Sequence, residues 1–208
     1  MKKSFTFKVV ESVLLFLMKP VFRPRVHLEE GATLTLEEPT ILVSNHVSHP
    51  DGSVIYWLFR RYHVHNLAAK DRFEQGGLME WYLKNSGCIP IDRKGVSTEF
   101  IHESVRMLLQ QKESLVIFPE GRHGQNGEIL PFHSGVTMIA AMTKAPVRMI
   151  YIDGKYKAFF GKRCRMRLSA PFHLPEPDNG LTADWVAAQT DALRNRMLSM
   201  QAAMKATS

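Results

Sequence analysis

Short apolar runs rich in β-branched residues alternate along this chain with segments of helical periodicity, and this alternation constrains the fold more than any other feature. The runs are short and bounded by proline, glycine or charged residues, which is typical of buried strands. The expected strands are residues 40–44, 64–68, 87–93, 114–118 and 146–152. The expected helices are residues 52–61, 76–83, 97–111, 136–142 and a C-terminal helix from about 182. This order predicts an α/β protein: an αβ sandwich with a central, largely parallel mixed sheet flanked by helices.

The chain of 208 residues has no internal repeat or low-complexity tract. We therefore expect a single domain over residues 26–208, preceded by a separate N-terminal helix. Within the domain, residues 26–36 alternate loosely around Gly31 and predict a short hairpin. Near the C-terminus, three arginines alternate with apolar residues, which predicts a half-buried strand with a cationic outer face. These arginines are Arg163, Arg165 and Arg167.

A polar corner between the first central strand and the next helix carries the most reactive combination of residues. His46 follows the strand that ends at Ser44, and Asp51 lies in or beside the first turn of the helix. A strand-to-helix corner can fold the carboxylate back onto the imidazole. The carboxylate would then fix the tautomer and leave the other ring nitrogen to accept a proton. The pair suits a general base, and its structural alternative is a surface-loop histidine beside a helix-capping aspartate.

A metal site is the second chemical interpretation of the same corner. His46, His49 and Asp51 are closely spaced, and imidazole with carboxylate suits zinc. However, Pro50 constrains the loop, and the chain has no His-Glu-x-x-His motif. Its two cysteines are far apart and match no metal spacing. We therefore expect no metal and no bound cofactor.

A second polar corner follows the strand that ends at Phe118. Pro119, Glu120 and Gly121 form a rigid turn with exposed backbone N–H groups, and Arg122 adds a planar guanidinium that suits phosphate. In isolation, the same residues describe an ordinary turn with a solvated arginine. In a parallel sheet, corners at the carboxyl ends of strands lie on one edge, where binding sites form.

The net charge of +7 favours anionic partners such as nucleic acid, an acidic membrane surface or a phosphorylated substrate. No arginine-rich arm or RNA-binding motif is present, so we expect no nucleic-acid partner.

The N-terminal residues 1–25 combine apolar residues at helical spacing with flanking lysines and arginines. Lys8, Glu11 and Ser12 interrupt the apolar stretch, which is far shorter than the ~20 residues of a spanning helix. A signal peptide requires a cleavage site of small residues, and none follows this stretch. The segment predicts an interfacial helix on membrane lipids, and the alternative is a helix packed on the protein's own core.

The corners share their order and spacing with a known family. Asn45-His46-x-x-x-x-Asp51, Gly87-x-Ile-Pro-Ile-Asp-Arg93 and Phe118-Pro-Glu-Gly121 together resemble the glycerolipid acyltransferase family, in particular its 1-acylglycerol-3-phosphate acyltransferases. The resemblance implies a glycerol-3-phosphate acyltransferase-like fold on the cytoplasmic face of a membrane. It also implies acyl transfer from acyl-CoA or acyl carrier protein, as co-substrate, to a lysophospholipid acceptor, giving phosphatidic acid.

Carried over to this chain, the resemblance makes His46 the general base and Asp51 its partner. The remaining matched positions would bind substrate: Asn45, Lys70, Arg93, Pro119, Glu120, Gly121 and Arg122. The sequence departs from the family pattern after Gly121, because Arg122 follows directly and His123 stands where an arginine is usual. Met149 and His133 also stand where the family usually has a proline and a lysine. Two other functions stay open: a non-catalytic lipid-binding module of the same fold, and a metal-dependent hydrolase.

Overall fold

The computed structural model describes residues 5–18, 24–86, 88–91, 98–124, 127–154, 163–178 and 180–207. Seven strands form one sheet: β1 (Arg25–Leu28), β2 (Ile41–Ser44), β3 (Val64–Ala69), β4 (Ile89–Ile91), β5 (Ser114–Ile117), β6 (Val147–Asp153) and β7 (Arg165–Leu168). The α-helices are α1 (Phe5–Met18), α2 (Asp51–Phe59), α3 (Gly77–Ser86), α4 (Glu99–Arg106), α5 (Gly135–Thr143) and α6 (Ala183–Ala206). Shorter helical turns are η1 (Arg60–Tyr62), η2 (Lys70–Phe73) and the π-helical η3 (Met107–Gln111).

The strand order is β1-β7-β6-β2-β5-β3-β4, and every neighbouring pair is parallel except β6 with β7. The predicted mixed, largely parallel sheet is therefore confirmed. β2 lies in the middle of the sheet between β6 and β5. The corners that follow β2 and β5 consequently emerge side by side at the carboxyl edge.

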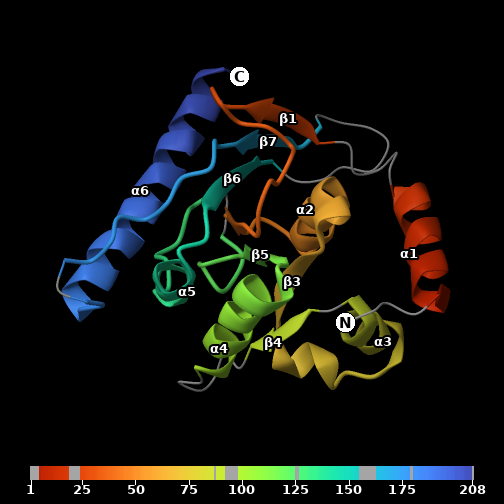
Figure 1. The fold of residues 1–208 in the computed structure, drawn as a ribbon. Helices are drawn as coiled ribbons and strands as arrows, with labels where there is room; N and C mark the ends of the chain where they lie inside the picture. Colours follow the sequence, from red (N-terminus) through yellow and green to blue (C-terminus); the bar gives the residue numbers. More distant parts are fainter. Residues whose placement is uncertain are drawn as a thin grey trace.

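Helices cover both faces of the sheet because the central strands alternate their side chains between two apolar cores. Ile41 and Val43 of β2 pack in one core with residues of α4, α5 and α6. Leu42, the residue between them, packs in the other core with Ile55 and Phe59 of α2. The predicted αβ sandwich follows from this period of two in β2, with α6 along one side of the sheet and α2 on the other (Figure 1).

The predicted hairpin over residues 26–36 is wrong. β1 pairs in parallel with β7, with Arg25 opposite Arg165, and residues 29–40 contain no strand. Gly31 does form a turn at a φ of +73°. Alternation in the sequence indicates a strand but not its partner, and here the partner is distant in the chain.

The strand β7 is half-buried in the expected alternating pattern. Its arginines, however, do not form a free cationic face. Arg165 forms an ion pair with Asp153, and Nε of Arg167 donates to Oε1 of Glu29 at 2.8 Å. Neighbouring β6 and the residue after β1 thus supply carboxylates that compensate the charge.

The helix α1 lies beside α3 at the outside of the molecule (Figure 1). Its Phe7 is fully buried against the rings of Trp81 and Tyr82, whose centroids are 5.5 and 5.8 Å away. Large apolar side chains on α1 are nevertheless exposed: Val9 by 47%, Val13 by 53% and Phe16 by 77%. Among the residues that the structure describes, no helix is both long and apolar enough to cross a membrane.

Candidate active site

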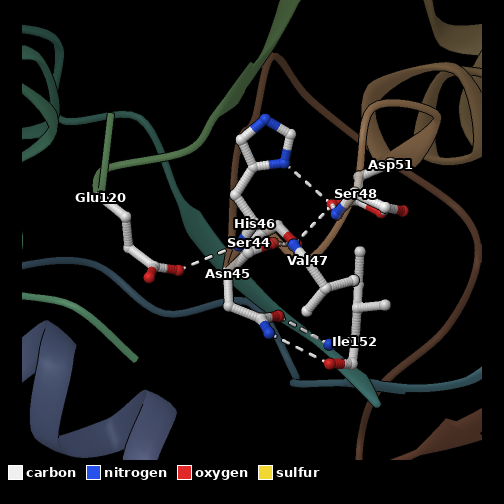
Figure 2. Close-up of polar contacts among 8 residues, drawn as sticks. All are labelled: Ser44, Asn45, His46, Val47, Ser48, Asp51, Glu120 and Ile152. Carbon is white, nitrogen blue, oxygen red and sulfur yellow. Dashed lines mark hydrogen bonds and ion pairs between the residues drawn. The ribbon is translucent and has the colours of Figure 1, made fainter. Parts of the chain in front are cut away.

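The corner after β2 is fixed to the neighbouring strand β6 by the side chain of Asn45. Its amide nitrogen donates to the carbonyl of Ile152 at 3.0 Å, and its amide oxygen accepts from the Ile152 N–H at 2.7 Å (Figure 2). These bonds continue the pairing of β2 with β6 just beyond its last registered pair, Ser44 with Ile150. Asn45 is buried, so the point at which His46 leaves the sheet is held within the protein.

The predicted contact between imidazole and carboxylate is present. Nδ1 of His46 lies 2.8 Å from Oδ2 of Asp51, the first residue of α2 (Figure 2). The same oxygen accepts the N–H groups of Val47 and Ser48, each at 2.8 Å, and Oδ1 accepts from Oγ of Ser48 at 3.1 Å. Because a carboxylate only accepts, it places the proton on Nδ1 and leaves Nε2 as the basic nitrogen.

Aromatic rings surround the imidazole. The Phe118 ring stacks on His46 with a centroid distance of 4.3 Å and an interplanar angle of 25°. The His123 ring lies 4.0 Å from His46, and His49 lies 4.5 Å from His123. An aromatic face beneath an imidazole stabilises its protonated form, which is the form that a general base produces.

The second corner holds the backbone of His46 from both sides. Oε1 of Glu120 accepts the His46 N–H at 2.9 Å (Figure 2), and the His46 carbonyl accepts the N–H of Gly124 at 2.9 Å. Oε2 of Glu120 accepts the Leu130 N–H at 2.8 Å. A Cβ at Gly124 would come within 2.2 Å of the Glu128 carbonyl oxygen, so this close approach requires glycine. The loop after β5 therefore positions the corner after β2.

Burial raises the pKa of the Glu120 carboxyl, because a charged carboxylate loses solvation inside the protein. The N–H groups of Leu130 and His46 and the charge of Arg194 oppose that rise in pKa.

The predicted substrate-binding residues divide into two groups. Asn45, Pro119 and Glu120 are buried, and the polar groups described above for Asn45 and Glu120 are occupied by the backbone. Asn45 and Glu120 thus hold the backbone of the two corners, and their expected contact with substrate stays a prediction. Gly121, Arg122 and Lys70 are exposed, and Lys70 follows β3 on the same edge of the sheet. The predicted phosphate ligand Arg93 lies outside the described residues.

The described part of the chain has no group of three or more His, Cys, Asp or Glu residues placed to hold a metal ion. His46, the first histidine considered for such a site, bonds Asp51. Another histidine, His65, pairs with Glu113 at the opposite end of the sheet.

Sequence reasoning missed the ring contacts of His46 and the backbone bonds of Asn45 and Glu120. The Phe118 contact had a local signal, since Phe118 directly precedes the Pro-Glu-Gly turn at a strand end. The partners Ile152 and Leu130 had none, because any residue offers the same N–H and carbonyl groups.

A known protein family and several of its members are similar to this chain. The family model described as Acyltransferase matches residues 23–153. The chain is 30% identical over 201 residues to the human 1-acyl-sn-glycerol-3-phosphate acyltransferase alpha, covering 93% of this chain and 69% of that protein. It is 32% identical over 128 residues to the 1-acyl-sn-glycerol-3-phosphate acyltransferase of Helicobacter pylori, covering 59% of this chain and 52% of that protein.

A solved structure has a similar fold. The crystal structure of the 1-acyl-sn-glycerophosphate (LPA) acyltransferase PlsC from Thermotoga maritima aligns with a TM-score of 0.61 at 18% sequence identity. The alignment covers 91% of this chain and 77% of that chain. At this identity the likeness concerns the fold, and it agrees with the αβ sandwich described above.

Proposed function

Because this chain belongs to the acyltransferase family, we propose that it moves a fatty acyl group from a thioester to the free hydroxyl of 1-acylglycerol 3-phosphate, giving phosphatidic acid. The names of its relatives support this acceptor. The observation that carries the proposal is the 2.8 Å contact between His46 and a fully buried Asp51 at the carboxyl edge of the sheet. The donor would be acyl-CoA or acyl carrier protein.

In the proposed reaction, Nε2 of His46 takes the proton of the acceptor hydroxyl as its oxygen attacks the thioester carbonyl. The tetrahedral intermediate then expels the thiolate, which receives that proton from the imidazolium. Asp51 holds the imidazolium through Nδ1, and the face of Phe118 supports its charge. Atoms and charge balance without any protein-bound acyl group.

The hydrogen bonds of Ser44 and Ser48, the serines on either side of His46 in the chain, support transfer of the acyl group straight to the acceptor, without an acyl-serine intermediate. Oγ of Ser48 donates to Asp51 at 3.1 Å, and Oγ of the fully buried Ser44 donates to the Asn45 carbonyl at 3.0 Å. Both hydroxyl protons are thus committed to other acceptors, so neither serine is arranged as a nucleophile activated by His46. The acceptor hydroxyl is the nucleophile that the proposal requires.

The acceptor phosphate would bind to exposed cations on the edge of the sheet. Arg122 follows β5, and Lys70 follows β3, the next strand in the sheet. A guanidinium can bind two phosphate oxygens at once, whereas an ammonium acts as a point charge. Arg93, which follows β4 in the sequence, remains a predicted third ligand.

The exposed apolar residues of α1 support peripheral attachment to a bilayer. Val9, Val13 and Phe16 would enter the lipid interface at the cytoplasmic face, while Phe7 keeps the helix on the protein. Both the acceptor lipid and the acyl chains would then reach the site from the membrane surface.

The test is a transfer assay on vesicles, with labelled acyl-CoA or acyl carrier protein thioester and a panel of lysophospholipids plus glycerol 3-phosphate. We expect 1-acylglycerol 3-phosphate to be the preferred acceptor. His46→Ala should lower kcat by about 10²- to 10⁴-fold. The matched control is His102→Ala, an exposed histidine on α4, which should retain wild-type activity.

Full activity of a folded His46→Ala protein would overturn the mechanism. Preference for glycerol 3-phosphate or for another lysophospholipid would overturn the acceptor. Vesicle binding without any thioester turnover would favour the non-catalytic lipid-binding module.

A further inference from the structure

The loop that positions His46 is itself held by α6, a helix that lies beyond the residues matched by the family model. Nε of Arg194 donates to the carbonyl of Leu130 at 3.1 Å, and Nη2 donates to the carbonyl of Ile129 at 3.0 Å. Two successive peptide carbonyls are therefore bound by one planar guanidinium. This arrangement fixes the orientation of the peptide that joins Ile129 to Leu130.

The same peptide is the one that meets the site. The Leu130 N–H donates to Oε2 of Glu120 at 2.8 Å, and Oε1 of Glu120 accepts the His46 N–H at 2.9 Å. An unbroken series of hydrogen bonds thus runs from Arg194 to the proposed base. Every link within it is a hydrogen bond of ordinary length.

We propose that Arg194 is a positioning residue for acyl transfer, acting through Leu130 and Glu120 on the backbone of His46. This inference rests on the proposed function, in which His46 is the general base. In this role Arg194 would act without contact to substrate. It would fix the position of the His46 backbone, and thereby the position of the imidazole relative to the acceptor hydroxyl.

A second contact from α6 supports this role. Nε2 of Gln201 donates to the carbonyl of Gly127 at 2.6 Å. Gln201 is two helical turns after Arg194, so both side chains project from the same face of α6. The described stretch from Gly127 to Leu130 is therefore held at both ends by one helix.

The charge of Arg194 also suits the state that Glu120 must keep. Both oxygens of Glu120 accept N–H groups, and an ionised carboxylate accepts such hydrogen bonds more strongly than a neutral carboxyl group does. Burial raises the pKa of Glu120, and the nearby guanidinium is one of the groups that lower it again. Removing Arg194 would thus destabilise the ionised form of Glu120 and also remove two hydrogen bonds to the loop.

The test compares three variants on the same helix, in the full chain. Arg194→Met removes the charge and both nitrogens that bind the loop, whereas Arg194→Lys keeps the charge on a single donor nitrogen. The matched control is Arg196→Met, because the Arg196 guanidinium lies over the Phe172 ring at 3.9 Å, away from the loop. Steady-state kinetics with 1-acylglycerol 3-phosphate, thermal unfolding, and NMR of the His46 Nδ1–H proton are measured for each.

We expect Arg194→Met to lower kcat by about 10- to 100-fold with KM changed less than about 2-fold, because misplacing a base slows the chemical step. Arg194→Lys should recover part of the loss, and Arg196→Met should keep the wild-type kcat. The Nδ1–H resonance, assigned by its loss in His46→Ala, should shift or broaden in Arg194→Met alone.

The inference is overturned if Arg194→Met keeps its kcat, raises only KM, or loses kcat and thermal stability in parallel with Arg196→Met. A wild-type protein without transferase activity would overturn the proposed function instead. In that event the resonance still decides the structural link: an unchanged Nδ1–H signal in Arg194→Met would refute it.

Discussion

Two histidine–carboxylate pairs of nearly equal length lie at opposite ends of the sheet. Nδ1 of His46 is 2.8 Å from Asp51 at the carboxyl edge, and Nε2 of His65 is 2.7 Å from Glu113 near the amino ends of β3 and β5. Distance does not distinguish them. The His46 side chain is 18% exposed and that of His65 is 8% exposed, so His46 is the more accessible to a substrate.

The carboxylates differ as well. Asp51 is fully buried and accepts three further hydrogen bonds from Val47 and Ser48, so its position is independent of the imidazole. Glu113 is 18% exposed at the end of a long, flexible side chain. A catalytic pair requires a carboxylate that stays fixed while the imidazole gains and loses a proton. The proposed function therefore assigns the catalytic role to the pair of His46 and Asp51, and a structural role to the pair of His65 and Glu113.

The largest expected effect is on kcat, and it should differ between the two histidine–carboxylate pairs. Asp51→Asn keeps the shape of the side chain but places an amide nitrogen among groups that need an acceptor. By analogy with triad aspartates, kcat should fall by about 10³- to 10⁴-fold. Glu113→Gln should change kcat by less than about 3-fold, since it lies on the other edge of the sheet. Equal losses in the vesicle assay would remove the distinction drawn between the pairs.

The free energy of unfolding should depend more on His65 than on His46, the opposite of the order expected for activity. His65→Ala leaves the partly buried Glu113 without its imidazole and should lower the free energy of unfolding by about 1–3 kcal/mol. His46→Ala should lower it by less than about 1 kcal/mol, because Asp51 keeps its backbone donors. Urea unfolding followed by circular dichroism measures both. A more destabilising His46→Ala would contradict this order.

A smaller effect tests the aromatic support of His46. Phe118→Leu removes the ring stacked at 4.3 Å and should lower kcat by about 2- to 5-fold, equivalent to ~0.5–1 kcal/mol of lost cation–π stabilisation. Phe172→Leu, which removes a ring beneath Arg196 instead, is the matched control and should leave kcat unchanged. If the two variants behave alike, the stacking has no part in the reaction.

The smallest expected effect is a change of stability with pH caused by Glu120, whose carboxylate accepts the His46 N–H. The folded-state pKa of Glu120 is raised above the unfolded value of 4.5, so the folded protein binds the proton more tightly. Its contribution to stability is therefore greatest below pH 4.5 and is lost as pH rises through the raised pKa. Relative to Glu120→Gln, the wild-type unfolding midpoint should decline over that window. A constant difference between the two proteins would show that the folded-state pKa is not raised.

The helices and strands of this protein were predictable because apolar periodicity is a local property. Residues 40–44, 114–118 and 146–152 were each expected as strands and correspond to β2, β5 and β6. The contact of His46 with Asp51 was also predictable, since the two residues lie on one short corner. The partner of β1 was not, because its alternation fits a local hairpin as well as a distant strand.

The sequence by itself determined the alternation of strands and helices and the contact of His46 with Asp51, since neighbours in the chain encode both. Only the tertiary structure decided that Asn45 and Glu120 face the backbone, that Arg165 and Arg167 meet carboxylates, and that α6 holds the loop behind His46. The physical reason is that these partners are peptide groups or charges brought together by strand order. A peptide N–H or carbonyl has no signature in the sequence, and its availability depends on which elements become neighbours in the fold.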